Sequence, residues 1–180
     1  TNYQTDATFR DSYSISFWIK PADGRPAFDE YIFSMTNTTA SAGELSISLD
    51  TNGKITHSIS AGGTTETDRT ISGFANGAQS NWFHIAITVD MSTSPVSTTI
   101  YIDGTSVSKD RLSEGARKQL GGFAADQDFH IGCRLKADAS IDKFFTGLLD
   151  EFAVFTTVLD ADSVAKIYNS GVPTDLKIDD

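Results

Sequence analysis

An alternation of apolar and polar side chains at every second residue recurs along most of this sequence, and it limits the fold more than any other feature. Such alternation is typical of β-strands that bury one face and turn the other toward water. About forty serine and threonine residues supply much of the polar half of the pattern. The clearest segments are residues 13–20, 45–49, 54–60, 83–89, 96–103, 129–135 and 144–155, with weaker ones at 31–35 and 64–71.

Turns and one helix complete the pattern. The Asn-Gly pair at 52–53 and the Asp-Gly pair at 103–104 each predict a tight hairpin turn. Only residues 160–169 have helical spacing, with an aspartate at 160 or 162 placed to cap the first turn. We therefore predict an all-β fold, an antiparallel β-sandwich or jelly roll with one short C-terminal helix.

The length and composition fit one domain. With 180 residues, of which 39% are hydrophobic, the chain can bury a conventional core without disulfides. Cys133 is the only cysteine, which excludes an intramolecular disulfide and a multi-cysteine zinc site. We expect a single domain over residues 1–180, with its core at about 12–171, a weak edge strand or linker at 1–11 and a tail at 172–180. The absence of an initial methionine indicates a processed or excised piece.

The net charge of the chain limits the kinds of partner that it can bind. A formal net charge of −10 repels phosphate backbones and attracts divalent cations, so we predict no nucleic-acid partner. No apolar run reaches the roughly 18 residues that span a bilayer, so we predict no membrane insertion. Basic residues gather at 109–118, where they could engage an acidic polysaccharide or a protein, although a solvated loop is the default interpretation.

Four segments resemble one known family. They read SISFWIKP at 14–21, NWFHIA at 81–86, TIYIDG at 99–104 and FTGLLDEF at 145–152. Similar strands occur in this order in the laminin G-like jelly rolls of the concanavalin A-like lectin/glucanase superfamily, so the resemblance implies the same sandwich. Residues 1–10 are a weak version of the opening strand of that family, so we expect one edge to be irregular or completed from elsewhere.

Catalytic motifs are missing from the sequence. The resemblance implies that a glucanase of this fold would set its carboxylates on one strand in a Glu-x-Asp-x-(x)-Glu pattern. We interpret Glu44, Glu66, Glu114 and Glu151 as isolated, and we find no lyase strand motif, nucleophile elbow or phosphate loop. We therefore predict that the chain is not an enzyme, and a glycan-active hydrolase or lyase is the least favoured alternative.

Calcium is the one cofactor that the resemblance implies. Asp150 matches an acid that donates a carboxylate to a structural Ca²⁺ in many relatives, and oxygen ligands suit this cation. Asp6 and Asp11 become further ligands if the N-terminal segment folds back beside the last long strand. The alternative is that Asp150 sits at a β-bulge and caps local amides.

Aromatic residues are the candidate ligand platforms. Trp18 and Trp82 have the polar parity of their strands, with His84 beside the second, so they could bind a glycan if that face is open. If a second layer covers the face, both rings belong to the core. Phe74 and Phe123 lie in long loops, where a ring either contacts ligand or packs under its own loop.

These features predict a non-catalytic binding module, namely a Ca²⁺-assisted carbohydrate-binding or adhesion domain of an extracellular, cell-surface or virion-surface protein. Its partner would then be a carbohydrate such as a surface glycan. The alternative is a structural sandwich that binds a protein partner in a larger assembly, such as a virion decoration, a fibre head or a coat.

Overall fold

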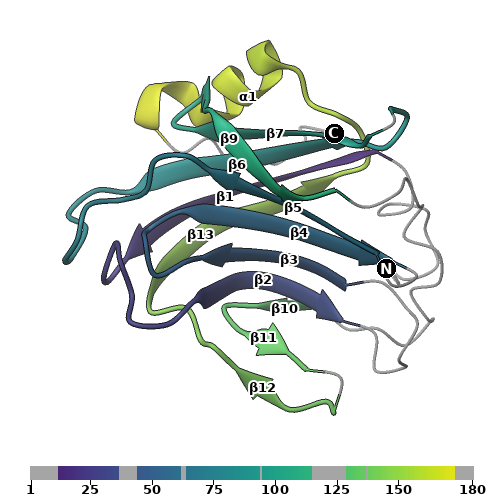
Figure 1. Cartoon of the computed structure of the whole chain (residues 1–180). Coiled ribbons are helices and arrows are strands. Elements are labelled where there is room, and N and C mark those ends of the chain that lie inside the picture. The colour runs from purple at the N-terminus through teal and green to yellow at the C-terminus, as the bar shows by residue number, and fades with distance from the viewer. Residues whose placement is uncertain are drawn as a thin grey trace, which may run out of the picture.

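Two antiparallel sheets face each other in the computed structural model, which describes residues 12–36, 44–61, 64–93, 95–114, 129–136 and 138–172 (Figure 1). The five-stranded sheet has the order β13 (Gly147–Phe155), β1 (Tyr13–Pro21), β6 (Phe83–Asp90), β7 (Ser97–Ile102) and β8 (Thr105–Ser106). The six-stranded sheet has the order β10 (Phe129–Ile131), β2 (Glu30–Thr36), β3 (Glu44–Leu49), β4 (Ile55–Ala61), β5 (Thr64–Thr70) and β9 (Lys109–Ser113). A small hairpin joins β11 (Arg134–Leu135) to β12 (Ile141–Asp142). The predicted β-sandwich is confirmed.

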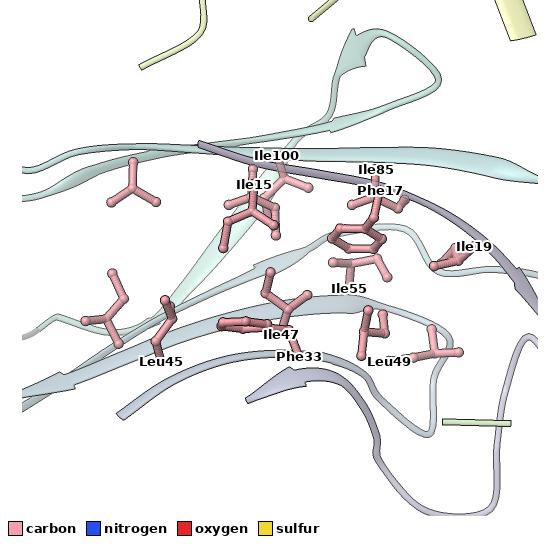
Figure 2. Packing of buried hydrophobic residues seen from close by; sticks show 14 of the residues in the cluster. Ile15, Phe17, Ile19, Phe33, Leu45, Ile47, Leu49, Ile55, Ile85 and Ile100 are labelled. Atoms are coloured by element: carbon pink, nitrogen blue, oxygen red, sulfur yellow. The ribbon is translucent and has the colours of Figure 1, made fainter. Parts of the chain in front are cut away.

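The core lies between the two sheets. Figure 2 shows Phe17 and Ile19 of β1 pointing toward Phe33, Ile47 and Leu49 of the opposite sheet, and all five side chains are fully buried. Successive side chains of a strand point to opposite faces, so the apolar half of segments 13–20, 45–49, 54–60, 83–89 and 96–103 fills this layer. The predicted segment 129–135 differs, because it divides into β10 and β11 and leaves Phe129 and Ile131 about half-exposed. Truncating Phe17 to alanine would cost about 3–5 kcal/mol, the usual range for a buried aromatic ring.

A β-bulge shapes the last long strand. The register between β1 and β13 shifts between Ser16 and Trp18, where β13 contributes one extra residue. Glu151 takes up the irregularity with a left-handed φ of 48°. The bulge turns Phe152 into the core, where its ring centroid lies 5.7 Å from that of Phe17.

Both predicted hairpin turns form. Gly53 has a φ of 76°, and the Asp50 carboxylate accepts the amides of Asn52 and Lys54 at 2.8 and 2.9 Å. In the second turn Gly104 has a φ of 73°, a left-handed conformation that glycine adopts without strain.

The predicted helix is α1 (Ala161–Tyr168), and it lies on the face of the five-stranded sheet away from the core (Figure 1). The Asp160 carboxylate accepts the Ser163 amide at 2.8 Å and so caps the first turn, as expected. Val164 is fully buried against Ala86 of β6. Asn169, in the left-handed region, ends the helix, and a 3₁₀ turn (Asn169–Gly171) follows.

Candidate functional site

Small hydroxyl side chains line the face of the six-stranded sheet that points away from the core, which we call the outer face. These residues alternate with buried apolar residues such as Ile47. The hydroxyls of Ser58 and Thr67 lie 3.1 Å apart. Ser48 is nearly buried on the same face. The strand register sets two rows across the sheet: Ser34, Ser46, Ser58 and Thr67 form one, and Tyr31, Ser48, Thr56 and Arg69 form the next.

The β11–β12 hairpin stands beside the outer face and forms a wall. Figure 1 shows it on the side of the six-stranded sheet away from β1 and β6. Ser34 fastens it to β2, because its hydroxyl donates to the Cys133 carbonyl and accepts the Leu135 amide, both at 2.9 Å. Cys133 and Leu135 are buried by this contact region. The hairpin is thus held in a fixed position.

Tyr31 lies where this wall meets the outer face. The guanidinium carbon of Arg134 is 5.5 Å from the ring centroid of Tyr31, and Nζ of Lys143 is 5.7 Å from it. The ring is half-buried, and burial raises the pKa of its hydroxyl, with a further rise from the charge of Glu44. The hydroxyl therefore stays protonated at neutral pH and remains able to donate a hydrogen bond.

Ion pairs hold both cations beside Tyr31. Arg134 donates to Asp142 through Nε at 2.8 Å and through Nη2 at 2.7 Å, a bidentate arrangement. The Nζ atom of Lys143 lies 3.4 Å from the carboxylate of Asp29. An aromatic ring surrounded by fixed donors and acceptors is what a hydroxyl-rich ligand requires, so we call Tyr31, Arg134, Asp142, Lys143 and Asp29 the Tyr31 cluster.

Two predicted ligand residues, Trp18 and His84, meet beneath α1 and not on an open surface. They pair across β1 and β6 with ring centroids 5.2 Å apart, and Tyr168 of α1 lies 5.8 Å from Trp18. Trp18 is 4% exposed and His84 is 0% exposed. The expectation that these two rings face a glycan is therefore corrected: the helix covers them, and they are packing residues.

Burial also sets the chemistry of His84. Its Nε2 atom lies 2.8 Å from the Ser16 hydroxyl, and burial lowers its pKa to about 4, so the ring is neutral at pH 7. Within the described residues neither His84 Nδ1 nor Trp18 Nε1 has a hydrogen-bond partner. A neutral, enclosed imidazole stabilises the helix contact and offers nothing to an external ligand.

The remaining aromatic candidates are dispersed. Trp82 is 38% exposed just before β6, so a ligand can reach part of its ring. Phe74 is 8% exposed and packs against Phe83 with centroids 4.7 Å apart, which corrects its interpretation as a platform. Phe123 lies outside the described residues.

Asp150 occupies the bulge of β13. It is exposed, and its Oδ1 atom accepts the amide of Glu151 at 2.8 Å. Among the residues that the structure describes, no three histidine, cysteine, aspartate or glutamate side chains group together as a metal site. Asp6 and Asp11 lie outside those residues, so Asp150 supplies one carboxylate there and not a complete calcium site.

Two cations of the basic segment, Lys109 and Arg111, pair with a buried acid, and residues 115–118 lie outside the described residues. Lys109 and Arg111 lie on β9, where Lys109 Nζ is 2.6 Å and Arg111 Nε is 3.1 Å from Oδ1 of Asp68. Burial works to raise the pKa of Asp68, but these hydrogen bonds outweigh it and hold the pKa below its usual value. A solvated basic loop is therefore the wrong interpretation for these two cations, which neutralise a buried acid.

Glu66 is not isolated, contrary to our interpretation of the sequence. Asp68 follows it by two residues on β5, and both side chains are buried on the face toward the core. Arg111 lies 3.2 Å from Glu66, and Asp68 is opposite His57 on β4. The pair is thus enclosed and neutralised, unlike the open carboxylates of a glycosidase.

Sequence reasoning missed the Tyr31 cluster. Tyr31 lay in a weak strand candidate. Arg134 was only a polar position of the predicted segment 129–135, and Asp142 and Lys143 lie just before the predicted segment 144–155. The available signal was the serine parity of residues 46, 48, 58 and 60, which marks a polar sheet face with few charges. This polar face becomes a candidate site only because the fold places Tyr31 in the same row as Ser48.

The chain belongs to the concanavalin A-like lectin/glucanases superfamily, whose Laminin_G_3 model matches residues 2–165. This match confirms the predicted family. No curated protein has a matching sequence.

Several solved structures share the fold. The CBM40 of the Ruminococcus gnavus IT-sialidase bound to α2,6-sialyllactose has a TM-score of 0.67 at 14% identity, over 93% of this chain and 90% of that one. The heptameric SAP-like pentraxin of Limulus polyphemus has a TM-score of 0.56 at 15% identity, over 88% and 70%. The binding domain of botulinum neurotoxin DC, in complex with rat synaptotagmin II, has a TM-score of 0.57 at 18% identity, over 91% of this chain and 37% of that one.

These neighbours include a carbohydrate-binding module and the binding domain of a neurotoxin, and the chain shares their fold. Identities this low establish the fold alone. In the described part of the chain, no helix is long and apolar enough to cross a membrane.

Proposed function

We propose that this chain is a non-catalytic glycan-binding module of an extracellular or surface-exposed protein, and that its ligand binds at the Tyr31 cluster beside the outer face. The observation that carries the proposal is the position of Tyr31, a half-buried ring with Arg134 and Lys143 within 6 Å of its centroid, at the end of a row of hydroxyls. An aromatic face contacts the apolar face of a pyranose, while fixed polar groups bind its hydroxyls.

The fold supports this use of the outer face. Ser34 joins the wall to the sheet through two hydrogen bonds, so we expect a ligand to bind with little reordering of this contact. Thr56, Ser58 and Thr67 are half-buried and offer hydroxyls along the rows. The sialyllactose complex of the CBM40 adds support as the ligand of a structural neighbour.

Paired variants of Tyr31 test the proposal. Glycans that bind on an array should lose about tenfold or more in affinity with Tyr31→Ala, because stacking contributes roughly 1–2 kcal/mol, whereas Tyr31→Phe should keep most of it. Trp82→Ala is the comparison, since it removes an exposed ring elsewhere. If Trp82→Ala abolishes binding while Tyr31→Ala has no effect, the Tyr31 cluster is not the site. Absence of any glycan signal would overturn the function itself.

We also propose that Ca²⁺ assists the module, with Asp150 as one ligand and Asp6 and Asp11 as its partners. The family resemblance supports this proposal, as does the exposed position of the Asp150 carboxylate. The cation would act on the structure of β13, an edge strand of the five-stranded sheet, whereas Tyr31 lies on β2 of the six-stranded sheet. Chelation should therefore lower stability more than it changes glycan specificity.

A protein partner is the second candidate function, and one observation favours it. Phe129 and Ile131 of β10 and Leu148 of β13 are large apolar side chains that are roughly half-exposed, and both strands lie at sheet edges within the described residues. Exposed apolar groups on edge strands are typical of association surfaces. Light scattering of the wild type against Leu148→Asp tests it: a larger mass that falls to the monomer in the variant supports an assembly role.

A further inference from the structure

The cations of the Tyr31 cluster each have a carboxylate partner of their own. We infer that the site selects uncharged sugars and rejects carboxylated or sulfated ones. This inference rests on the proposed function, and it names the chemical class of the ligand at the same site.

The side edge of the Arg134 guanidinium is already occupied. Its Nε and Nη2 atoms both bind Asp142, at 2.8 and 2.7 Å, so this bidentate edge is not open to an incoming carboxylate. The hydrogen bonds from Arg134 also lower the pKa of Asp142, so this carboxylate stays ionised near neutral pH. An acidic sugar that used this edge would have to displace Asp142, and at any other edge of Arg134 it would still meet the nearby negative charge of Asp142.

The ion pair of Lys143 is longer and more exposed than that of Arg134. Its Nζ atom lies 3.4 Å from Asp29, with side chains 31% and 43% exposed. The charge of Asp29 nevertheless reaches Tyr31, since it raises the pKa of the tyrosine together with burial and Glu44. An anion that approached Lys143 would meet this carboxylate as well.

The surroundings add more negative charge. Glu44 is close enough to Arg134 for that cation to influence its pKa, and the whole chain carries a formal charge of −10. Specificity often arises from repulsion of the wrong ligand, and like charges placed together are an effective means. Paired acids and bases still serve a neutral sugar, because its hydroxyls donate to carboxylates and accept from cations.

A preference for neutral sugars would distinguish this chain from its structural neighbour. Sialyllactose carries a carboxylate, and the CBM40 that binds it is 14% identical to this chain. Because the two proteins share the fold but few residues, the charges at each site determine which class of ligand binds. In this chain those charges favour neutral sugars.

Matched glycan pairs test the inference. Neutral oligosaccharides such as lactose would be titrated beside their sialylated, uronic and sulfated counterparts at low and physiological salt. The wild type should bind the neutral member at least about tenfold more tightly, and salt should narrow the gap. Equal or tighter binding of the acidic members overturns the inference and leaves the proposed function intact. No binding of either class overturns the proposed function, and the inference with it.

Two variants convert the prediction into a gain of function. Asp142→Asn frees Arg134 and Asp29→Asn frees Lys143, so each should improve acidic-glycan affinity by several-fold and weaken neutral binding, because a carboxylate that accepts sugar hydroxyls is lost. Asp162→Asn is the matched control, because it removes the same charge from α1. Thermal unfolding would confirm that each variant is folded. Equal gains with Asp162→Asn would mean that net charge, and not the pairing at Tyr31, sets the preference.

Discussion

The imidazole of His84 and the hydroxyl of Ser16 share a 2.8 Å contact beneath α1, and neither side chain reaches solvent. A second buried histidine, His57, lies 3.1 Å from the Tyr13 hydroxyl within the core. Burial lowers the pKa of each histidine to about 4. Both rings are therefore neutral in the folded protein at pH values where they are protonated in the unfolded chain.

This difference predicts an acid-sensitive stability. Between pH 6.5 and 4 the unfolded chain binds protons that the folded chain does not, so the free energy of unfolding should fall as the pH is lowered through this window. Each histidine can contribute up to about 3 kcal/mol of this loss. Urea unfolding from pH 7.5 to 4.5 measures it. His84→Gln should flatten the dependence, His130→Gln should keep the losses due to His57 and His84, and an unchanged stability across the window would contradict the assignment.

The fold could be predicted from the sequence because alternation reports directly on two faces of a strand. Ile15, Phe17 and Ile19 sit where their parity placed them, in the core. Parity does not say what covers the opposite face, and so Trp18 could be assigned to an open groove or to packing with equal consistency. The position of α1 decides between the open groove and packing. This position depends on the contacts of Val164 with Ala86 and of Tyr168 with Trp18.

The site was harder to predict because its residues are close in space and carry no shared pattern. Tyr31 is about a hundred residues from Arg134, and their proximity depends on the Ser34 contact that fixes the hairpin. The sequence did not predict the ion pairs of Asp68 for a similar reason. Lys109 and Arg111 resemble surface charges in the sequence, and only the pairing of β9 with β5 brings them to Asp68. Charge patterns in sequence do not show which cation already has a partner.

Removal of the Asp68 carboxylate should destabilise the protein strongly. Asp68 is fully buried and bound by Lys109 at 2.6 Å and Arg111 at 3.1 Å, so Asp68→Ala would leave these cations without their main partner. Breaking a buried ion pair in this way costs about 3–5 kcal/mol, and partial exposure of the cations places this site toward the lower end. Chemical denaturation measures the loss. Asp110→Ala on the neighbouring strand β9, where the side chain is exposed, should cost under about 0.5 kcal/mol.

Loss of the helix cap should loosen the cover over Trp18. Asp160→Ala removes the acceptor for the Ser163 amide and should cost about 1 kcal/mol, whereas Asp160→Asn, an equally good cap, should cost little. Because α1 covers the Trp18 ring, iodide or acrylamide should quench more tryptophan fluorescence in Asp160→Ala than in Asp160→Asn. Equal quenching in both variants would show that Val164 packing alone holds the helix in place.

Calcium should stabilise the chain through Asp150. Binding to the folded state alone adds about 2.7 kcal/mol when free Ca²⁺ is 100 times its Kd, so thermal unfolding should shift upward with CaCl₂ and return with EDTA. Asp150→Asn should abolish the shift, while Asp162→Asn, which removes an exposed charge from α1, should retain it. Mg²⁺ should substitute poorly, because it demands a tighter octahedral shell. If wild-type unfolding is the same in CaCl₂ and EDTA, Asp150 acts only as the cap of the Glu151 amide in the bulge.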